Sequence, residues 1–176
     1  MIIQSNLKWN KNTDDICKQA FDRMWMIRRL KALGASNDEL VDVYAKQVRS
    51  ILEQAVAVWS PSLTLNQAAQ IERVQKTFCA VVLGPKYIVY PISLSVLDLS
   101  TLDERRQNQC SNFGKKCVKS QKYQNWFVPK TNDPDNVQTR SDKTGLVPGN
   151  ARTKSYRKSP LPYLTEQLSV CKSRKI

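Results

Sequence analysis

Two adjacent aspartates, Asp14 and Asp15, are the residues of this sequence that most directly suggest catalysis. A carboxylate pair can hold the two magnesium ions of a phosphoryl-transfer site, but such a site needs a third carboxylate and a tight turn between strands. Here the pair opens a stretch with helical periodicity, where negative charge complements the positive end of the helix dipole. The sequence therefore favours a structural role for both aspartates and predicts no metal site.

The other common catalytic chemistries lack their residues. There is no histidine, so no serine or cysteine nucleophile can be activated by an imidazole. The five glycines form no phosphate-binding loop, and the five cysteines form no C-x-x-C pair of the kind that binds zinc. The odd number of cysteines and the absence of a signal peptide predict reduced thiols in an intracellular protein, nuclear or cytoplasmic. No apolar run approaches the roughly 20 residues that cross a bilayer, so no membrane partner is expected.

Positive charge is the dominant property of the composition. Lys and Arg total 28 against 15 acidic residues, which gives a net charge of +13. The net charge rises along the chain, from +2 in residues 1–60 to +4 in 61–120 and +7 in 121–176. RNA or DNA is the partner class that this charge favours. A basic pI that reflects only lineage or solubility remains an alternative, because net charge alone does not define specific binding.

Three clusters of cations lie at positions that could contact phosphates. Their members are Arg28, Arg29 and Lys31 at the end of a predicted first helix, Arg73 and Lys76 on one face of a third, and Arg105 and Arg106 in the first turn of a fourth. The helix dipole accounts for the first cluster but disfavours cations in a first turn. Arg105 and Arg106 therefore need either an internal carboxylate (Asp98, Asp103 or Glu104) or an external phosphate, and the sequence leaves both open.

Aromatic side chains could stack on bases in a nucleic-acid-binding protein. Trp25 and Trp59 each neighbour an apolar stripe, so we predict that both anchor the core. Tyr87 and Tyr90 follow a Gly-Pro break and are predicted to lie at the surface. Trp126 remains a candidate for stacking.

Capping signals and apolar periodicity place the helices that would position these residues. The predicted N-terminal caps are Asn12 or Thr13 for the first helix, Ser36 with Glu39 for the second, Thr64 with Gln67 for the third and Thr101 with Glu104 for the fourth. The corresponding ends are predicted at Gly34, near Trp59 before Pro61, at Gly84-Pro85 and at about Ser120. A loop and a short helical turn are expected between residues 87 and 99.

The predicted fold class is all-α, a small bundle of about four helices. The chain length supports one domain, with or without a tail. Residues 1–11 are expected to form a short extended segment, residues 12–127 the helical domain, and residues 128–176 a disordered basic tail. Within that tail, residues 163–170 carry a weak helical signal.

Four motifs in a fixed order resemble a known family. They are W-x-P-x-L-T within VYAKQVRSILEQAVAVWSPSLT, I-E-R-V-Q-K and L-G-x-x-Y within IERVQKTFCAVVLGPKYIVY, and L-D-E-R-R within LSVLDLSTLDERRQNQCSNFGKK. Together with RMWMIRRLKALGAS, they resemble the C-terminal part of jockey-like, LINE-type non-LTR retrotransposon reverse transcriptases. The likeness covers about residues 3–127 and corresponds to the helical thumb and the segment beyond it.

The resemblance implies a fragment of an RNA-directed DNA polymerase. Its opening stretch, IIQSNLKW, looks like the last strand of the palm, whereas the fingers, most of the palm and the catalytic aspartates have no counterpart here. We therefore expect no catalytic residue, no cofactor in this chain and no polymerase activity by the chain alone. The full-length family would use magnesium. The implied partners are RNA, DNA or RNA–DNA hybrid, and the missing palm and fingers.

A thumb grips the template–primer by its backbone, with one helix against the minor groove and cations reaching phosphates. The candidate contact residues are carried over by position and charge rather than by a matched binding motif: Arg28, Arg29, Lys31, Arg73, Lys76, Arg105 and Arg106. The alternative is a catalytically inert helical protein-interaction module, with an apolar patch around IIQSNLKW that once packed on the palm.

Overall fold

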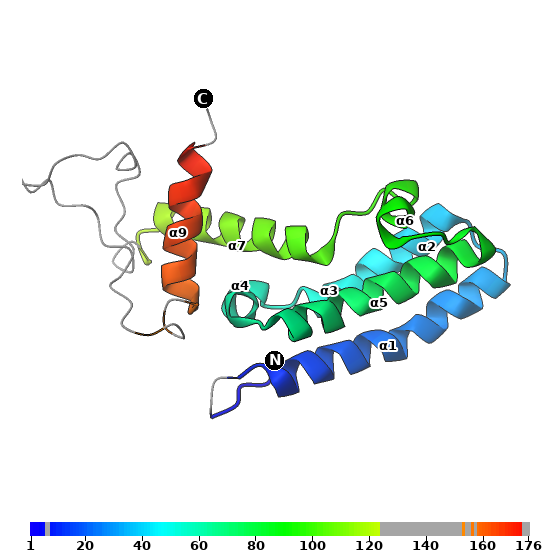
Figure 1. The fold of residues 1–176 in the computed structure, drawn as a ribbon, viewed down its shortest axis with the longest axis horizontal. Coiled ribbons are helices and arrows are strands. Elements are labelled where there is room, and N and C mark those ends of the chain that lie inside the picture. The colour runs from blue at the N-terminus through cyan, green and yellow to red at the C-terminus, as the bar shows by residue number, and fades with distance from the viewer. Residues whose placement is uncertain (6–7, 124–152, 154–155, 157, 174–176) are drawn as a thin grey trace, which may run out of the picture. The chain divides into compact units, whose positions relative to one another are not determined.

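The structure is a computed structural model that describes residues 1–5, 8–123, 153, 156 and 158–173 (Figure 1). Every regular element within these residues is a helix, which confirms the all-α fold class. The chain divides into two units, the first made of residues 1–56 and 63–106 and the second of residues 57–62 and 107–176. Each unit is described by itself below.

The helices outnumber the four expected. The first unit contains α1 (Asn10–Ala32), α2 (Asn37–Val43), the π-helix η1 (Tyr44–Arg49), α3 (Ser50–Leu52), α5 (Leu65–Leu83), the 3-10 turn η3 (Gly84–Lys86) and α6 (Tyr90–Val96). The second contains most of α4 (Val56–Trp59), the 3-10 turn η2 (Ser60–Ser62), the greater part of α7 (Leu102–Lys119) and α9 (Pro160–Ser173). The four predicted helices correspond to α1, the segment from α2 to α4, α5 and α7.

The start of α1 differs from the prediction. The helix begins at Asn10 after a buried Trp9 that makes no side-chain cap, so Asn12 and Thr13 lie inside it and are buried. The backbone N–H of Lys11 instead donates to Gln4 Oε1 at 3.0 Å, and Asn12 Oδ1 accepts from the backbone of Ile2 at 2.9 Å. Residues 1–5 and 8–9 therefore pack back onto α1, and none of these described residues lies in a strand.

The second predicted helix is broken rather than continuous. The Ser36 and Glu39 capping box forms as expected and opens α2. The π-helix η1 then buries Tyr44 and Val48 completely. Beyond α3, Ala55 adopts a positive φ of 52°, a conformation that is costly for a residue with a Cβ, and this residue separates α3 from α4. Apolar periodicity could not reveal this break, because the buried residues Tyr44, Val48, Leu52 and Val56 keep a spacing of four from η1 to beyond Ala55.

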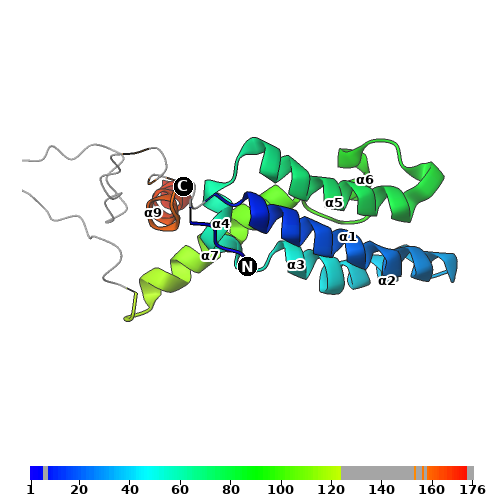
Figure 2. The ribbon, with the colours of Figure 1, turned by 90° about the horizontal axis from the view of Figure 1, so that it is seen from below.

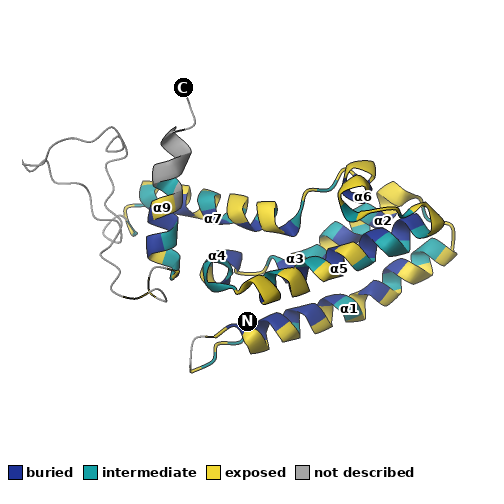
Figure 3. Ribbon diagram, in the orientation of Figure 1, coloured by how far each residue is buried: buried dark blue, intermediate teal, exposed yellow. Residues whose placement is uncertain are grey.

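The core of the first unit is made where α1, the α2–η1–α3 segment and α5 lie side by side (Figure 2). α5 has the predicted Thr64 and Gln67 capping box and ends at Gly84, whose φ is 54°. Its Phe78 is fully buried and stacks on Tyr44, with ring centroids 4.0 Å apart. Figure 3 shows the buried faces of α1 and α5 turned inward and their exposed faces turned outward. This burial supplies the main driving force for the unit.

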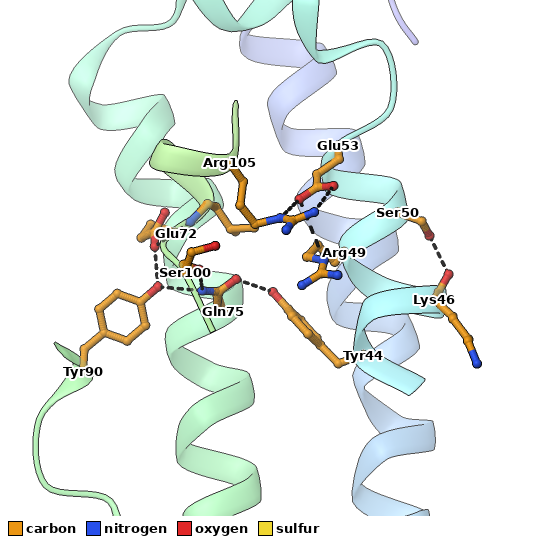
Figure 4. Close-up of polar contacts among 11 residues, drawn as sticks. Tyr44, Lys46, Arg49, Ser50, Glu53, Glu72, Gln75, Tyr90, Ser100 and Arg105 are labelled. Atoms are coloured by element: carbon orange, nitrogen blue, oxygen red, sulfur yellow. Dashed lines mark hydrogen bonds and ion pairs between the residues drawn. The ribbon is translucent and has the colours of Figure 1, made fainter. Parts of the chain in front are cut away.

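A polar network crosses this core through Gln75, which is fully buried (Figure 4). Its Oε1 accepts from Tyr44 Oη at 2.9 Å, while its Nε2 donates to Ser100 O at 2.8 Å and to Tyr90 Oη at 3.2 Å. Tyr90 Oη also donates to Glu72, whose Oε1 accepts from the backbone of Leu102. The network thus connects η1, α5, α6 and the start of α7. Burial, the largest cause, and Glu72 raise the pKa of Tyr90, so the phenol stays a donor.

The second unit contains a helix where disorder was predicted. α9 packs against η2, and Ser62 Oγ donates to Lys158 O at 2.8 Å. A Cβ on Gly114 of α7 would lie 3.4 Å from both Leu164 and Leu168, so glycine permits close packing of α9 on α7. The expectation of disorder is wrong for α9, whereas the helical signal at residues 163–170 is confirmed. Residues 128–152 lie outside the described residues.

None of the described helices is, by itself, long and apolar enough to cross a bilayer. Residues Leu65–Lys86 and Tyr90–Val96 meet the length and composition test only as a pair, across a bend of 81°. Within α5, the apolar residues Ile71, Val74, Phe78, Val82 and Leu83 are buried in the core.

The network predicts that Gln75 contributes strongly to stability. Gln75→Ala should lower the free energy of unfolding by about 3 kcal/mol, because it leaves the Tyr44 hydroxyl and the Ser100 carbonyl without partners and opens a cavity. Urea unfolding followed by circular dichroism measures this change. The control Gln70→Ala removes one exposed hydrogen bond, to Asp14, and should cost no more than about 0.5 kcal/mol. Equal losses for the two variants would contradict the role assigned to Gln75.

Candidate nucleic-acid interface

Each aspartate of the pair on α1 accepts a hydrogen bond from a glutamine side chain. Asp14 Oδ1 accepts from Gln70 Nε2 at 2.9 Å, and Asp15 Oδ2 accepts from Gln19 Nε2 at 2.8 Å. Within the described residues, no three acidic, cysteine or histidine side chains gather where they could hold a metal ion. The third carboxylate that a two-magnesium site needs is therefore not found beside Asp14 and Asp15 among the described residues.

Lys31, one of the seven candidate cations, is engaged inside the fold. Its Nζ donates to the backbone carbonyls of Val81 and Val82, the latter at 2.8 Å, near the C-terminal end of α5. The last carbonyls of a helix have no intrahelical donor and carry partial negative charge. Lys31 satisfies two of them with two of its three N–H donors, so capping of α5 explains its position.

Arg105 has an internal carboxylate partner that lies far away in sequence. Its guanidinium forms a two-point contact with Glu53, in which Nη2 lies 3.1 Å from Oε2 (Figure 4). Arg49 Nε lies 3.8 Å from the same carboxylate. These hydrogen bonds from Arg105 to Glu53 raise the pKa of the guanidinium. The partner is thus none of the nearby carboxylates considered from the sequence.

Arg106 is also committed to the fold. It is only 2% exposed, and its Nη2 lies 2.9 Å from Asp103 Oδ1, one of the predicted alternatives. Its Nη1 is buried and has no hydrogen-bond partner. For Arg105 and Arg106 the internal-carboxylate alternative therefore describes the folded chain.

Arg73 and Lys76 remain directed to solvent on the outer face of α5. Both are exposed, and neither makes an ion pair within the described residues. Their spacing of three residues places them one turn apart on the same face. Lys76 Nζ lies 5.2 Å from the centroid of the Tyr90 ring, a cation–π contact that leaves its hydrogen-bond donors free. These two cations form the pair on α5 that can contact phosphates.

Arg28 and Arg29 form a second exposed pair, on the C-terminal part of α1. Neither side chain makes a hydrogen bond or ion pair in the described part of the chain. α1 and α5 pack side by side and run parallel, because Asp14 contacts Gln70 near their starts and Lys31 reaches Val82 near their ends. The fold thus places the two helices side by side. The two cationic pairs lie at different heights along the helix axes, Arg28 and Arg29 near the C-terminal end of α1 and Arg73 and Lys76 in the middle of α5.

Sequence reasoning misplaced two aromatic residues of the first unit. Trp59 is fully buried, as predicted, but Trp25 is 61% exposed on α1. The core stripe of α1 passes through Met24 and Ile27, and Trp25 falls outside it. Periodicity counted from Met24 would have found this. Tyr90 is half-buried rather than at the surface, because its hydroxyl enters the Gln75 network.

In the second unit, α7 carries further exposed cations that were outside the candidate set. Lys115, Lys116 and Lys119 are all exposed, and no acidic residue occurs between Glu104 and Asp133. Their spacing places the three lysines on one side of the helix. The signal that could have found them is this acid-free run.

The cysteines of the first unit are unsuited to nucleophilic chemistry. Cys17 and Cys79 are buried and unpaired. Burial raises the pKa of each thiol to about 11. Because the thiolate is the reactive form, both side chains behave as small core residues.

Comparison with known proteins gives no match: no family model, curated protein or solved structure is significantly similar to this chain. The resemblance to reverse transcriptases therefore rests on the sequence motifs.

Substituting a cation that is paired within the fold should destabilise the protein more than substituting a cation that is exposed to solvent. Arg105→Ala should lower the free energy of unfolding by about 1–3 kcal/mol, because Glu53, whose side chain is 13% exposed, loses its two-point partner. Arg73→Ala should change it by no more than about 0.5 kcal/mol, since Arg73 has no such partner. Urea unfolding of the two variants under identical conditions measures the difference. A larger loss for Arg73→Ala would contradict this expectation.

Proposed function

We propose that these residues form the template–primer-gripping thumb region of a non-LTR retrotransposon reverse transcriptase. The ordered motifs in residues 3–127 suggest the family. The observation that carries the proposal is the exposed pair Arg73 and Lys76 on α5, a helix held rigidly from its inner side by the core and the Gln75 network. A rigid helix with outward cations suits contact with a sugar-phosphate backbone.

In this function the chain positions nucleic acid and performs no chemistry. Arg73 and Lys76 would contact phosphates of an RNA–DNA hybrid or duplex RNA, and Arg28 and Arg29 would extend the contact along α1. Contacts to phosphates position the duplex without reading its sequence. Magnesium and the catalytic carboxylates would belong to the palm. Lys31, Arg105 and Arg106 would act indirectly, by holding α5 and the start of α7 in place.

Charge reversal on α5 tests the proposal. The double variant Arg73→Glu/Lys76→Glu should weaken binding to a labelled RNA–DNA hybrid by about tenfold or more at low salt, because two charged contacts are lost. The slope of log affinity against log salt should decrease by about 2. Fluorescence anisotropy over a range of salt concentrations measures both quantities.

The matched control for net charge is Lys11→Glu/Lys18→Glu on α1, which reverses two exposed cations outside the candidate set. It should reduce affinity less than the α5 variant does. Absence of wild-type binding below physiological ionic strength, or binding insensitive to salt, would reject the proposed function.

A second candidate is a catalytically inert helical protein-interaction module, and an apolar stripe on and before α6 favours it. Four large apolar side chains are exposed within nine residues: Ile88 is 71% exposed, Val89 47%, Ile92 50% and Val96 63%. Ile88, Ile92 and Val96 are spaced four apart. Met1 and Ile3, in the patch expected around IIQSNLKW, are also exposed. Apolar stripes of this kind commonly mark protein contacts.

This second function predicts association driven by the α6 stripe. The wild type should self-associate or bind an apolar dye, and Ile92→Asp should abolish both, because a charge in the stripe opposes its desolvation. Size-exclusion chromatography with light scattering and dye fluorescence measure these properties. Sulfate should strengthen this association, whereas salt weakens binding to nucleic acid. A monomeric wild type without dye binding would count against this function.

A further inference from the structure

Trp25 is a large aromatic side chain that the core of the first unit does not use. It is 61% exposed on α1, although Met24 and Ile27 beside it are fully buried. Two exposed arginines follow it at one-turn spacing, Arg28 three residues on and Arg29 four residues on. Residues at these spacings lie on the same helix face, with Cβ atoms about 5–6 Å apart. The outer face of α1 therefore presents an indole ring next to two guanidinium groups.

The charge on this face is uneven along the helix. Asp22 lies one turn before Trp25 and is exposed, so the positive strip extends only toward the C-terminal end of α1. No hydrogen bond or ion pair engages Arg28 or Arg29 within the described residues. The negative end of the α1 dipole favours both arginines where they are. The dipole does not satisfy the N–H donors of the two guanidinium groups, and these donors remain available to an anionic ligand.

A nucleotide has the two chemical features that this face can bind. Its base offers a flat π-face that stacks on an indole, and its phosphate accepts hydrogen bonds from guanidinium groups. In a duplex each base is already stacked between its neighbours, so its face is not free, whereas an unpaired nucleotide can expose it. Trp25 thus favours a single strand, in contrast to the backbone contacts that Arg73 and Lys76 would make with a duplex.

We propose that Trp25, Arg28 and Arg29 form a binding site for single-stranded RNA or DNA, in which an unpaired base stacks on Trp25 and the arginines contact the flanking phosphates. This site rests on the proposed nucleic-acid function and adds single-stranded nucleic acid to the duplex as a partner. A template strand continuing beyond its paired region has the required chemistry.

The test compares two labelled probes by fluorescence anisotropy. One is a blunt RNA–DNA hybrid and the other is the same hybrid with a single-stranded RNA overhang of about six nucleotides, within the range that a single-strand site covers. Trp25→Ala should weaken binding of the overhang probe at least about fivefold and change binding of the blunt probe by less than about twofold. Trp25→Phe should retain most of the affinity, because it keeps an aromatic face.

Two further variants separate stacking from charge and from general surface effects. Arg28→Gln/Arg29→Gln should lower the salt slope measured with the overhang probe by about 1.4, the value for two contacts to a single strand. Leu65→Ala is the matched control, because Leu65 is an apolar side chain that is 90% exposed on α5. This substitution should leave the affinity for both probes unchanged. Quenching of tryptophan fluorescence by poly(U) should be larger for the wild type than for Trp25→Phe.

The outcomes distinguish this site from the proposed function. If the wild type binds neither probe, both proposals are rejected. If it binds both probes and Trp25→Ala behaves as wild type, or loses both equally, the single-strand site is rejected and duplex gripping stands. A Trp25-dependent blue shift with phosphatidylserine vesicles, without any effect on the overhang probe, would assign this face to an anionic membrane surface and also overturn the site.

Discussion

Gln75 occupies the position on which the geometry of the first unit depends. A fully buried primary amide must find partners for its donors and its acceptor, and here they come from three other segments: Tyr44 of η1, Tyr90 of α6 and the backbone of Ser100. Apolar packing alone tolerates small rotations of a helix, but these directional bonds do not. Because Gln75 lies inside α5, fixing its rotation also fixes the outward direction of Arg73 and Lys76.

The seven candidate cations of this unit fall into two groups. Lys31, Arg105 and Arg106 satisfy carbonyls or carboxylates of the fold, whereas Arg28, Arg29, Arg73 and Lys76 retain free donors. Because some cations are engaged within the fold, the net charge of +13 overstates how many of them can contact a polyanion. Three of the seven candidate cations stabilise the scaffold that presents the other four. A thumb-like function would need both groups, one for rigidity and one for contact.

Local signals predicted local features well. The capping boxes at Ser36 and Thr64 formed because their partners lie three residues away. The start of α1 was missed because its cap comes from Gln4, outside the helix, and the partner of Arg105 was missed because Glu53 is 52 residues distant. The break after α3 depends on η1 and on the backbone of Ala55. These features depend on packing between segments that are distant in sequence. Helix propensity and apolar periodicity carry no information about such packing. The exposure of Trp25 could have been predicted from the stripe through Met24.

The two surfaces proposed for the first unit are physically connected through Tyr90. Its hydroxyl binds Glu72 and Gln75 of α5, its ring lies 5.2 Å from Lys76 Nζ, and its backbone begins α6, which carries the apolar stripe. A partner that covers Ile92 and Val96 would hold α6 against α5 and so restrict the Tyr90 ring. Lys76 would then be ordered by its cation–π contact before any phosphate arrives, and less side-chain entropy would be lost on binding. Binding at the two surfaces should therefore be cooperative.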